Sequence, residues 1–191
     1  MQAVMIQSLS NRVYPVTLIK REAIMFRVFT LLTATSLLAS GPLLAGVEVR
    51  FIEGAPKDRF IVKNVGACDL EGAIVNIDLS PSAGQLVFDV AEAGVGVDVF
   101  QPLELVDGAD ALVQPPLVTD GQTFVTLEVA TLASGSNISF TIDVDDTIGQ
   151  REITVSGSEI EGTTVSYVSG AQTSTAVFST DALANLPIAD C

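Results

Sequence analysis

The feature that most constrains the fold of this chain is a strict alternation of apolar and polar residues near its middle. In the segment ISFTIDVD (138–145) every second residue is Ile, Phe or Val, and the residues between them are Ser, Thr or Asp. Successive side chains of a β-strand point to opposite faces of the sheet, so this segment has one apolar face and one polar face. Such a strand is typical of an antiparallel sheet that covers a core on one side. The pattern predicts an antiparallel β-protein.

Similar alternating segments recur along the chain at intervals of about ten residues, and Gly, Pro, Asn, Asp and Ser residues separate them. The expected strands are residues 46–53, 58–64, 73–79, 86–90, 97–106, 122–130, 138–146, 152–155, 163–168 and 174–179. After them we expect a tail, 181–191, with one helical turn at 181–185. This spacing predicts an all-β, immunoglobulin-like antiparallel β-sandwich of about 8–10 strands. It would be an atypical one, because the chain has no Trp and its two cysteines lie too far apart for the core disulfide of that fold.

The N-terminal segment has the composition of a secretory signal peptide. Arg27 precedes the apolar run FTLLTATSLL (29–38), and small residues follow up to Ala45. We therefore expect a signal-peptide helix within residues 25–45, cleavage near Ala45, and a single β-sandwich domain over residues 46–191. Residues 1–24 are expected to be disordered or not translated, because Met25 opens a more ordinary signal peptide. The alternative is an uncleaved membrane anchor, although the apolar run is short for a membrane span.

Removal of residues 1–45 makes the expected mature chain strongly acidic. Nine basic residues less four, and 23 acidic residues less one, leave five basic and 22 acidic residues, a net charge of −17. Such a surface repels nucleic acid and anionic lipid and attracts cations. We therefore expect no nucleic-acid partner and no stable membrane insertion after cleavage. Solubility alone is the simplest alternative explanation of the charge.

The two cysteines, Cys68 and Cys191, both lie in the expected mature chain. Export would place them in an oxidising compartment, where an intramolecular disulfide is the simplest outcome. The alternative is two free thiols or intermolecular pairing.

The inventory of reactive side chains argues against an enzyme. The chain has no His, which removes the Ser-His-Asp and Cys-His arrangements and the commonest zinc ligand. The segment around Gly94 and Gly96 has neither the spacing nor the following helix of a phosphate-binding loop. We expect no catalytic residue and no organic cofactor.

The best candidate site is a group of carboxylates at the end of the strand 138–146. Asp143 and Asp145 would project from one face, and Asp146 lies at the strand end. Adjacent carboxylates repel one another unless they are protonated or bound to a cation, and calcium takes six to eight oxygen ligands. We therefore consider a calcium site at Asp143, Asp145 and Asp146, with Glu152 as a further ligand. The alternative is a solvated strand end in an acidic protein.

Several runs of this chain resemble one family of proteins: VRFIEGAPKDRFIVKNVGAC (49–68), IDLSPSAGQLVFD (77–89), VFQPLELV (99–106) and FTIDVDDTIGQREITVSGSEIEG (140–162). They are similar to small exported bacterial proteins labelled aggregation factor core, after the sponge cell-aggregation proteoglycan. The resemblance implies secretion, to the periplasm, the medium or the cell surface, and calcium-dependent adhesion. Other cell-surface proteins or glycans would then be the partners. A periplasmic binding or accessory module on the same scaffold is the alternative.

Overall fold

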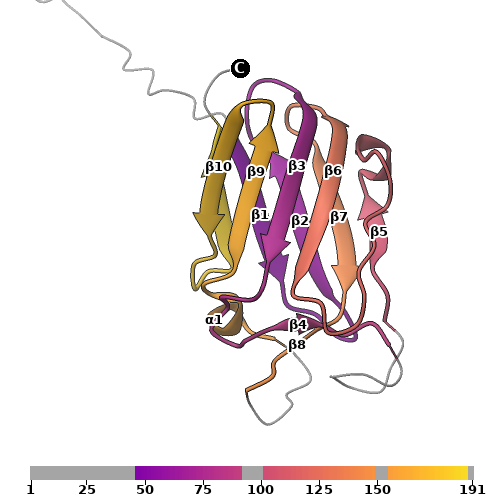
Figure 1. The fold of residues 1–191 in the computed structure, drawn as a ribbon, viewed down its shortest axis with the longest axis vertical. Coiled ribbons are helices and arrows are strands. Elements are labelled where there is room, and N and C mark those ends of the chain that lie inside the picture. Colours follow the sequence, from indigo (N-terminus) through magenta and orange to yellow (C-terminus); the bar gives the residue numbers. More distant parts are fainter. Residues whose placement is uncertain (1–45, 92–100, 149–154, 189–191) are drawn as a thin grey trace, which may run out of the picture. The chain divides into compact units, whose positions relative to one another are not determined.

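The computed structural model describes residues 46–91, 101–148 and 155–188. These residues form eleven strands, one 3-10 helix and one short α-helix (Figure 1). The strands are β1 (Gly46–Ile52), β2 (Asp58–Asn64), β3 (Leu70–Asp78), β4 (Val87–Phe88), β5 (Glu104–Asp107), β6 (Phe124–Leu132), β7 (Asn137–Ile142), β8 (Val144–Asp145), β9 (Thr164–Ser169), β10 (Gln172–Val177) and β11 (Leu183–Pro187). The helices are η1 (Ala109–Ala111) and α1 (Gly157–Ile160). All strand pairs are antiparallel, as the alternation predicts.

Two main sheets lie face to face, and a small third sheet lies at one end of them (Figure 1). The first sheet has the order β11-β1-β2-β7-β5, and the second has the order β10-β9-β3-β6. The third sheet pairs β4 with β8. This arrangement confirms a mostly antiparallel, sandwich-like β-protein.

The apolar faces of the two main sheets form one core. Aromatic rings cluster within it, where Phe60 contacts Phe51, Phe88 and Phe140 at centroid distances of 5.1, 6.3 and 5.3 Å. The apolar residues of the 138–144 segment are all buried in this core, namely Ile138, Phe140, Ile142 and Val144. The alternation therefore identified the inward face of β7 and β8 correctly.

The C-terminal segment differs from the prediction. Residues 183–187 form strand β11 at the edge of the first sheet, although a helical turn was expected at 181–185. Ala184 and Leu186 are buried, whereas Asn185 and Pro187 are exposed. This two-residue period, together with the free edge of β1, outweighs the weak local helix propensity of so short a segment.

The remaining differences are local. Strand β4 is shorter than expected, and β5 begins at Glu104. Helix α1 was not predicted, although Ser156 and Glu159 have the spacing of a capping box, and the Ser156 backbone N–H donates to Glu159 Oε2 at 2.7 Å. The expected signal peptide, residues 97–100 and residues 152–154 lie outside the described residues. Within the described ranges, no helix is long and apolar enough to cross a membrane.

Candidate cation site

The third sheet brings carboxylates from distant parts of the chain onto one face. Val87 pairs with Asp145 and Phe88 with Val144, and the Asp89 backbone N–H donates to the Asp143 carbonyl oxygen at 3.1 Å. Residues paired across a ladder share a face, and their neighbours point to the other face. Asp89, Asp143 and Asp145 therefore lie on one face, opposite the face that carries the buried Phe88.

Asp89 has the most unusual environment of these residues. Its side chain is only 1% exposed to solvent. No N–H or O–H group of the described chain donates a hydrogen bond to either of its carboxylate oxygens. A buried polar group without such a partner is costly, and an ionised one more so. The Asp89 carboxyl therefore requires a proton or a cation to compensate its charge.

A turn on the other side of β4 adds a fourth carboxylate. The Phe88 backbone N–H donates to the Gln122 carbonyl oxygen at 2.9 Å. The Gly121 backbone N–H donates to the Phe88 carbonyl oxygen, also at 2.9 Å. The next amide, that of Val90, donates to Asp120 Oδ1 at 3.1 Å. These bonds hold the Asp120 carboxyl within hydrogen-bonding reach of the Asp89 side chain.

The start of β2 supplies a fifth acidic residue to the same end of the sandwich. Asp58 pairs with Ile142, the residue before Asp143. Its Oδ1 accepts a hydrogen bond from the Gly54 backbone N–H at 3.0 Å, and its side chain is buried. Asp58 is thus better satisfied than Asp89, and it extends the negative charge toward Asp143.

The crowding of these groups raises the pKa of Asp89. Burial is the largest cause, since it disfavours the charged form. The hydrogen-bonding contact with Asp120 and the charges of Asp145, Asp120 and Asp143 act in the same direction. Together they raise the pKa of Asp89 from 3.8 to about 7.

The pKa values of two neighbouring carboxyls, Asp143 and Asp58, are raised as well. Burial, followed in effect by the charge of Asp145, raises the pKa of Asp143 to about 6. Burial also raises the pKa of Asp58 to about 7, although its hydrogen bond from Gly54 acts in the opposite direction. Lys57 lowers the pKa of Asp143, but less than burial raises it.

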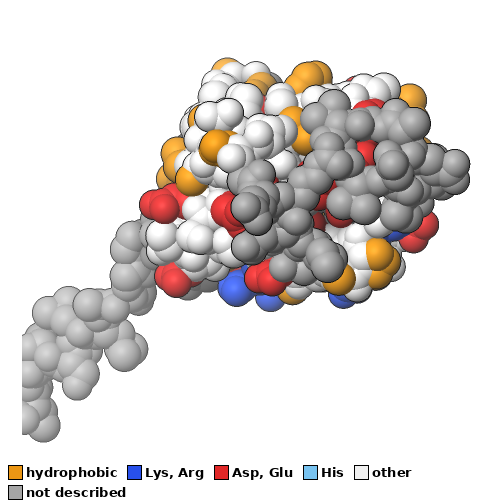
Figure 2. All heavy atoms as spheres, turned by 90° about the horizontal axis from the view of Figure 1, so that it is seen from below, with side chains coloured by type: hydrophobic (Ala, Val, Ile, Leu, Met, Phe, Trp, Pro, Cys, Tyr) orange, Lys and Arg blue, Asp and Glu red, His pale blue; other side chains and the backbone are white. Residues whose placement is uncertain are grey.

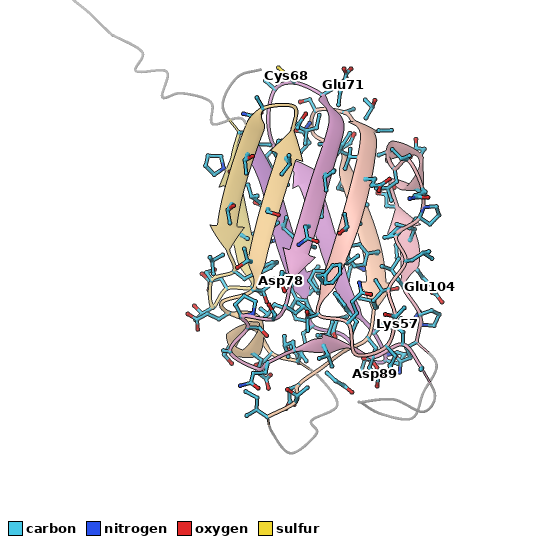
Figure 3. All side chains as sticks on the ribbon, viewed as in Figure 1. Lys57, Cys68, Glu71, Asp78, Asp89 and Glu104 are labelled. Carbon is cyan, nitrogen blue, oxygen red and sulfur yellow. The ribbon has the colours of Figure 1, made fainter. Side chains whose placement is uncertain are left out.

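Lys57 balances this charge only in part. Lys57 lies at the same end of the sandwich as Asp89, opposite the end that carries Cys68 (Figure 3). Its Nζ donates to the Pro102 carbonyl oxygen at 2.8 Å and lies 2.9 Å from Glu104 Oε1, so its charge is already shared. Figure 2 views this end of the molecule and shows Asp and Glu side chains at several places, with Lys and Arg along one margin.

Of the predicted calcium ligands, the structure places Asp143 and Asp145 in the group around Asp89 and places Asp146 outside it. Asp143 and Asp145, each 8% exposed, lie in the buried group rather than on a solvated strand end. Asp146 lies at the following turn, where its Oδ1 accepts a hydrogen bond from the Ile148 N–H at 3.1 Å. Glu152 lies outside the described residues. Among the described side chains, no three acidic, His or Cys groups are already spaced to hold a metal ion together.

Sequence reasoning missed Asp58, Asp89 and Asp120. Asp89 lies near the end of the predicted strand 86–90, as Asp143 and Asp145 lie near the end of 138–146, and this was the one available signal. The pairing of β4 with β8 could not be read from the sequence, because both strands have only two residues.

The predicted disulfide involves the opposite end of the molecule. Cys68 lies half-buried in the loop between β2 and β3, and its carbonyl oxygen accepts a hydrogen bond from Asn64 Nδ2 at 2.8 Å. No cysteine of the described residues is free. Cys191 lies outside those residues, so its pairing with Cys68 stays a prediction.

Comparison of the chain with protein-family models, with curated proteins and with solved structures gives no match.

Proposed function

We propose that this protein is a noncatalytic, exported β-sandwich that acts in cell adhesion or aggregation with the help of calcium. The observation that carries the proposal is the group of buried carboxylates at the β4–β8 end, where Asp89 has no hydrogen-bond donor. The signal-peptide pattern before Ala45 and the resemblance to aggregation factor core proteins support export and adhesion. The periplasm, the medium and the cell surface are all compatible with this role.

We infer an immunoglobulin-like sandwich, because two antiparallel sheets of five and four strands face each other across one core. Sandwiches of this kind carry binding loops at their ends, which is where the carboxylates lie.

A second candidate is a periplasmic binding or accessory module. A groove of about 320 Å³ lies beside β6. Its lining residues are Gln114, Pro115, Pro116, Leu117, Gln122, Phe124, Thr126 and Glu128. Small-molecule sites usually combine aromatic walls with a few convergent polar groups. This groove has one aromatic residue, and two of its polar side chains, Gln114 and Glu128, hydrogen-bond to each other at 3.3 Å. We therefore rank this function second.

A bead assay tests the adhesion proposal. The purified protein is coupled to fluorescent beads, which are mixed in buffer with calcium chloride or with sodium chloride of equal ionic strength. We expect the beads to cluster in calcium and to disperse when EDTA is added. Beads coated with an unrelated protein of similar net charge serve as the control, because calcium can bridge any acidic surface.

Two outcomes would count against adhesion. Beads that stay dispersed in calcium would show that the protein does not adhere to copies of itself. The same beads should then be tested for binding to the surface of the source cells. If the coated beads bind neither one another nor those cells, the adhesion proposal fails. Tight binding of a small molecule in the groove beside β6, weakened by Phe124→Ala, would favour the binding module instead.

A further inference from the structure

We propose that Asp89, Asp120, Asp143 and Asp145 together bind one calcium ion at the β4–β8 end of the sandwich. This inference rests on the proposed function for the identity of the cation. It differs from the sequence-based site, because it adds Asp89 and Asp120 and leaves out Asp146.

The decisive residue is Asp89. It is 1% exposed, both of its carboxylate oxygens lack a donor, and its side chain lies against Asp120 and near Asp145 and Asp143. Like charges that face each other across a β-ladder are destabilising. The Asp89 carboxyl therefore needs a proton or a cation to compensate its charge, and the neighbouring carboxylates offer oxygen ligands to a cation.

The chemistry of the donor set favours calcium among the common cations. Every candidate ligand is a carboxylate oxygen, and the chain has no His. Oxygen-only sites suit hard cations, whereas zinc and copper favour nitrogen or sulfur. The ligands come from three segments of the chain, Asp89, Asp120 and 143–145, joined by short ladders and a turn. Calcium tolerates such irregular geometry, whereas magnesium demands a near-ideal octahedron.

Asp89 and Asp143 can reach a common cation by side-chain rotation. Residues directly opposite each other in an antiparallel ladder have Cβ atoms about 4.5–5.5 Å apart, which applies to Asp89 and Asp143. Calcium–oxygen distances are about 2.3–2.6 Å, so two such side chains can bind one ion between them. The described groups are not spaced to hold a metal ion as they stand, so binding requires the Asp side chains to turn toward a common point.

Thermal unfolding of the purified full chain tests this inference at neutral pH. The wild type, Asp89→Asn, Asp145→Asn and Asp110→Asn are each titrated with calcium chloride, magnesium chloride and sodium chloride. Asp110 is exposed in η1, near the other end of the sandwich, so its substitution is a matched control for charge. The cooperativity of unfolding in calcium-free buffer shows whether each variant is folded.

We expect calcium to raise the wild-type and Asp110→Asn midpoints by about 3–6 °C at ten times Kd, and to raise them further with the logarithm of its concentration above that. Asp89→Asn and Asp145→Asn should lower the calcium affinity at least about tenfold, because ligand charge sets that affinity. In calcium-free buffer Asp89→Asn should unfold at a higher temperature than the wild type, since it removes a buried charge. An ordinary structural carboxylate would give the opposite sign.

Two results would overturn the inference. One is a wild-type response to calcium that sodium chloride of equal ionic strength reproduces. The other is a full calcium shift in both Asp89→Asn and Asp145→Asn. If calcium binds as expected but the coated beads bind neither one another nor the source cells, the site stands and the adhesion proposal falls.

Discussion

Asp89 and Asp143 face each other across a short antiparallel ladder, where the Asp89 backbone N–H donates to the Asp143 carbonyl oxygen at 3.1 Å. The backbone bond fixes two carboxylates on one face of the ladder, and both are largely withdrawn from water. Two ionised groups in this position repel each other unless a proton or a cation lies between them. The predictions about pH and about calcium both follow from this relationship.

The stability of the calcium-free protein should fall as the pH rises through neutrality. The pKa values of Asp58, Asp89 and Asp143 are raised from 3.8 to about 7, 7 and 6 in the folded protein. Between the unfolded pKa of 3.8 and the raised folded pKa values, the folded state holds more protons than the unfolded state. The free energy of unfolding therefore decreases as the pH rises through this range. Their contribution is fully present below about pH 4 and is lost as the pH rises through about 6–7. Thermal midpoints measured across this range check the sign.

The same pH series has an internal control. Asp89→Asn should make the decline shallower, because the substituted residue no longer titrates. A midpoint that rises steadily from about pH 4 to about pH 8 in both proteins would show that these carboxyls are not held in the way described.

Phe60 should be the most sensitive position of the core. It is fully buried and packs against three other aromatic rings. Phe60→Ala should lower the free energy of unfolding by about 3–5 kcal/mol, through lost burial and the cavity it leaves. Phe124, which is 47% exposed, offers a matched control, and Phe124→Ala should cost far less. Urea denaturation of both variants measures the difference, and equal losses would contradict the assigned core.

The predicted disulfide between Cys68 and Cys191 would close a long loop. In the chain-entropy model such a loop contributes about 4–5 kcal/mol to stability, less any strain. Mass spectrometry of unreduced peptides should show the two cysteines linked within one chain. Reduction, or the double substitution of both cysteines by Ser, should lower the thermal midpoint. Native protein in which both thiols react with an alkylating agent would exclude the bond.

If the protein is exported, its N-terminus should result from cleavage of the signal peptide. Protein recovered from the periplasm or the medium should begin near Gly46, because the apolar run ends in small residues at Ala45. N-terminal sequencing decides the position. Recovery of the chain only in an intact, membrane-bound form would contradict cleavage.

Most of the strands could be predicted because the alternation of apolar and polar residues indicates which side of a strand is buried. Strand β2 was expected at 58–64 and lies there, and the inward residues of β7 were assigned correctly. The pattern fails where a segment is short. Strand β11 has only five residues, and its strand conformation depends on the partner β1, which a local pattern does not reveal.

The candidate site could be predicted only in part, for a related reason. The alternation of 138–145 puts Asp143 and Asp145 on the same face, which the ladder reproduces. Their burial depends on the pairing with β4 and on the turn at 119–122, both distant in sequence. Asp89 and Asp120 each look like ordinary polar residues at the end of a strand or in a turn until these contacts are known.

The most direct test of the cation site is a crystal structure of the protein grown with calcium, with anomalous data collected at a wavelength where calcium scatters. We expect one anomalous peak between Asp89, Asp120, Asp143 and Asp145, with carboxylate oxygens about 2.3–2.6 Å from the ion. An Asp89 carboxyl that remains without a cation, while calcium at saturating concentration lies elsewhere or is not bound, would contradict the account.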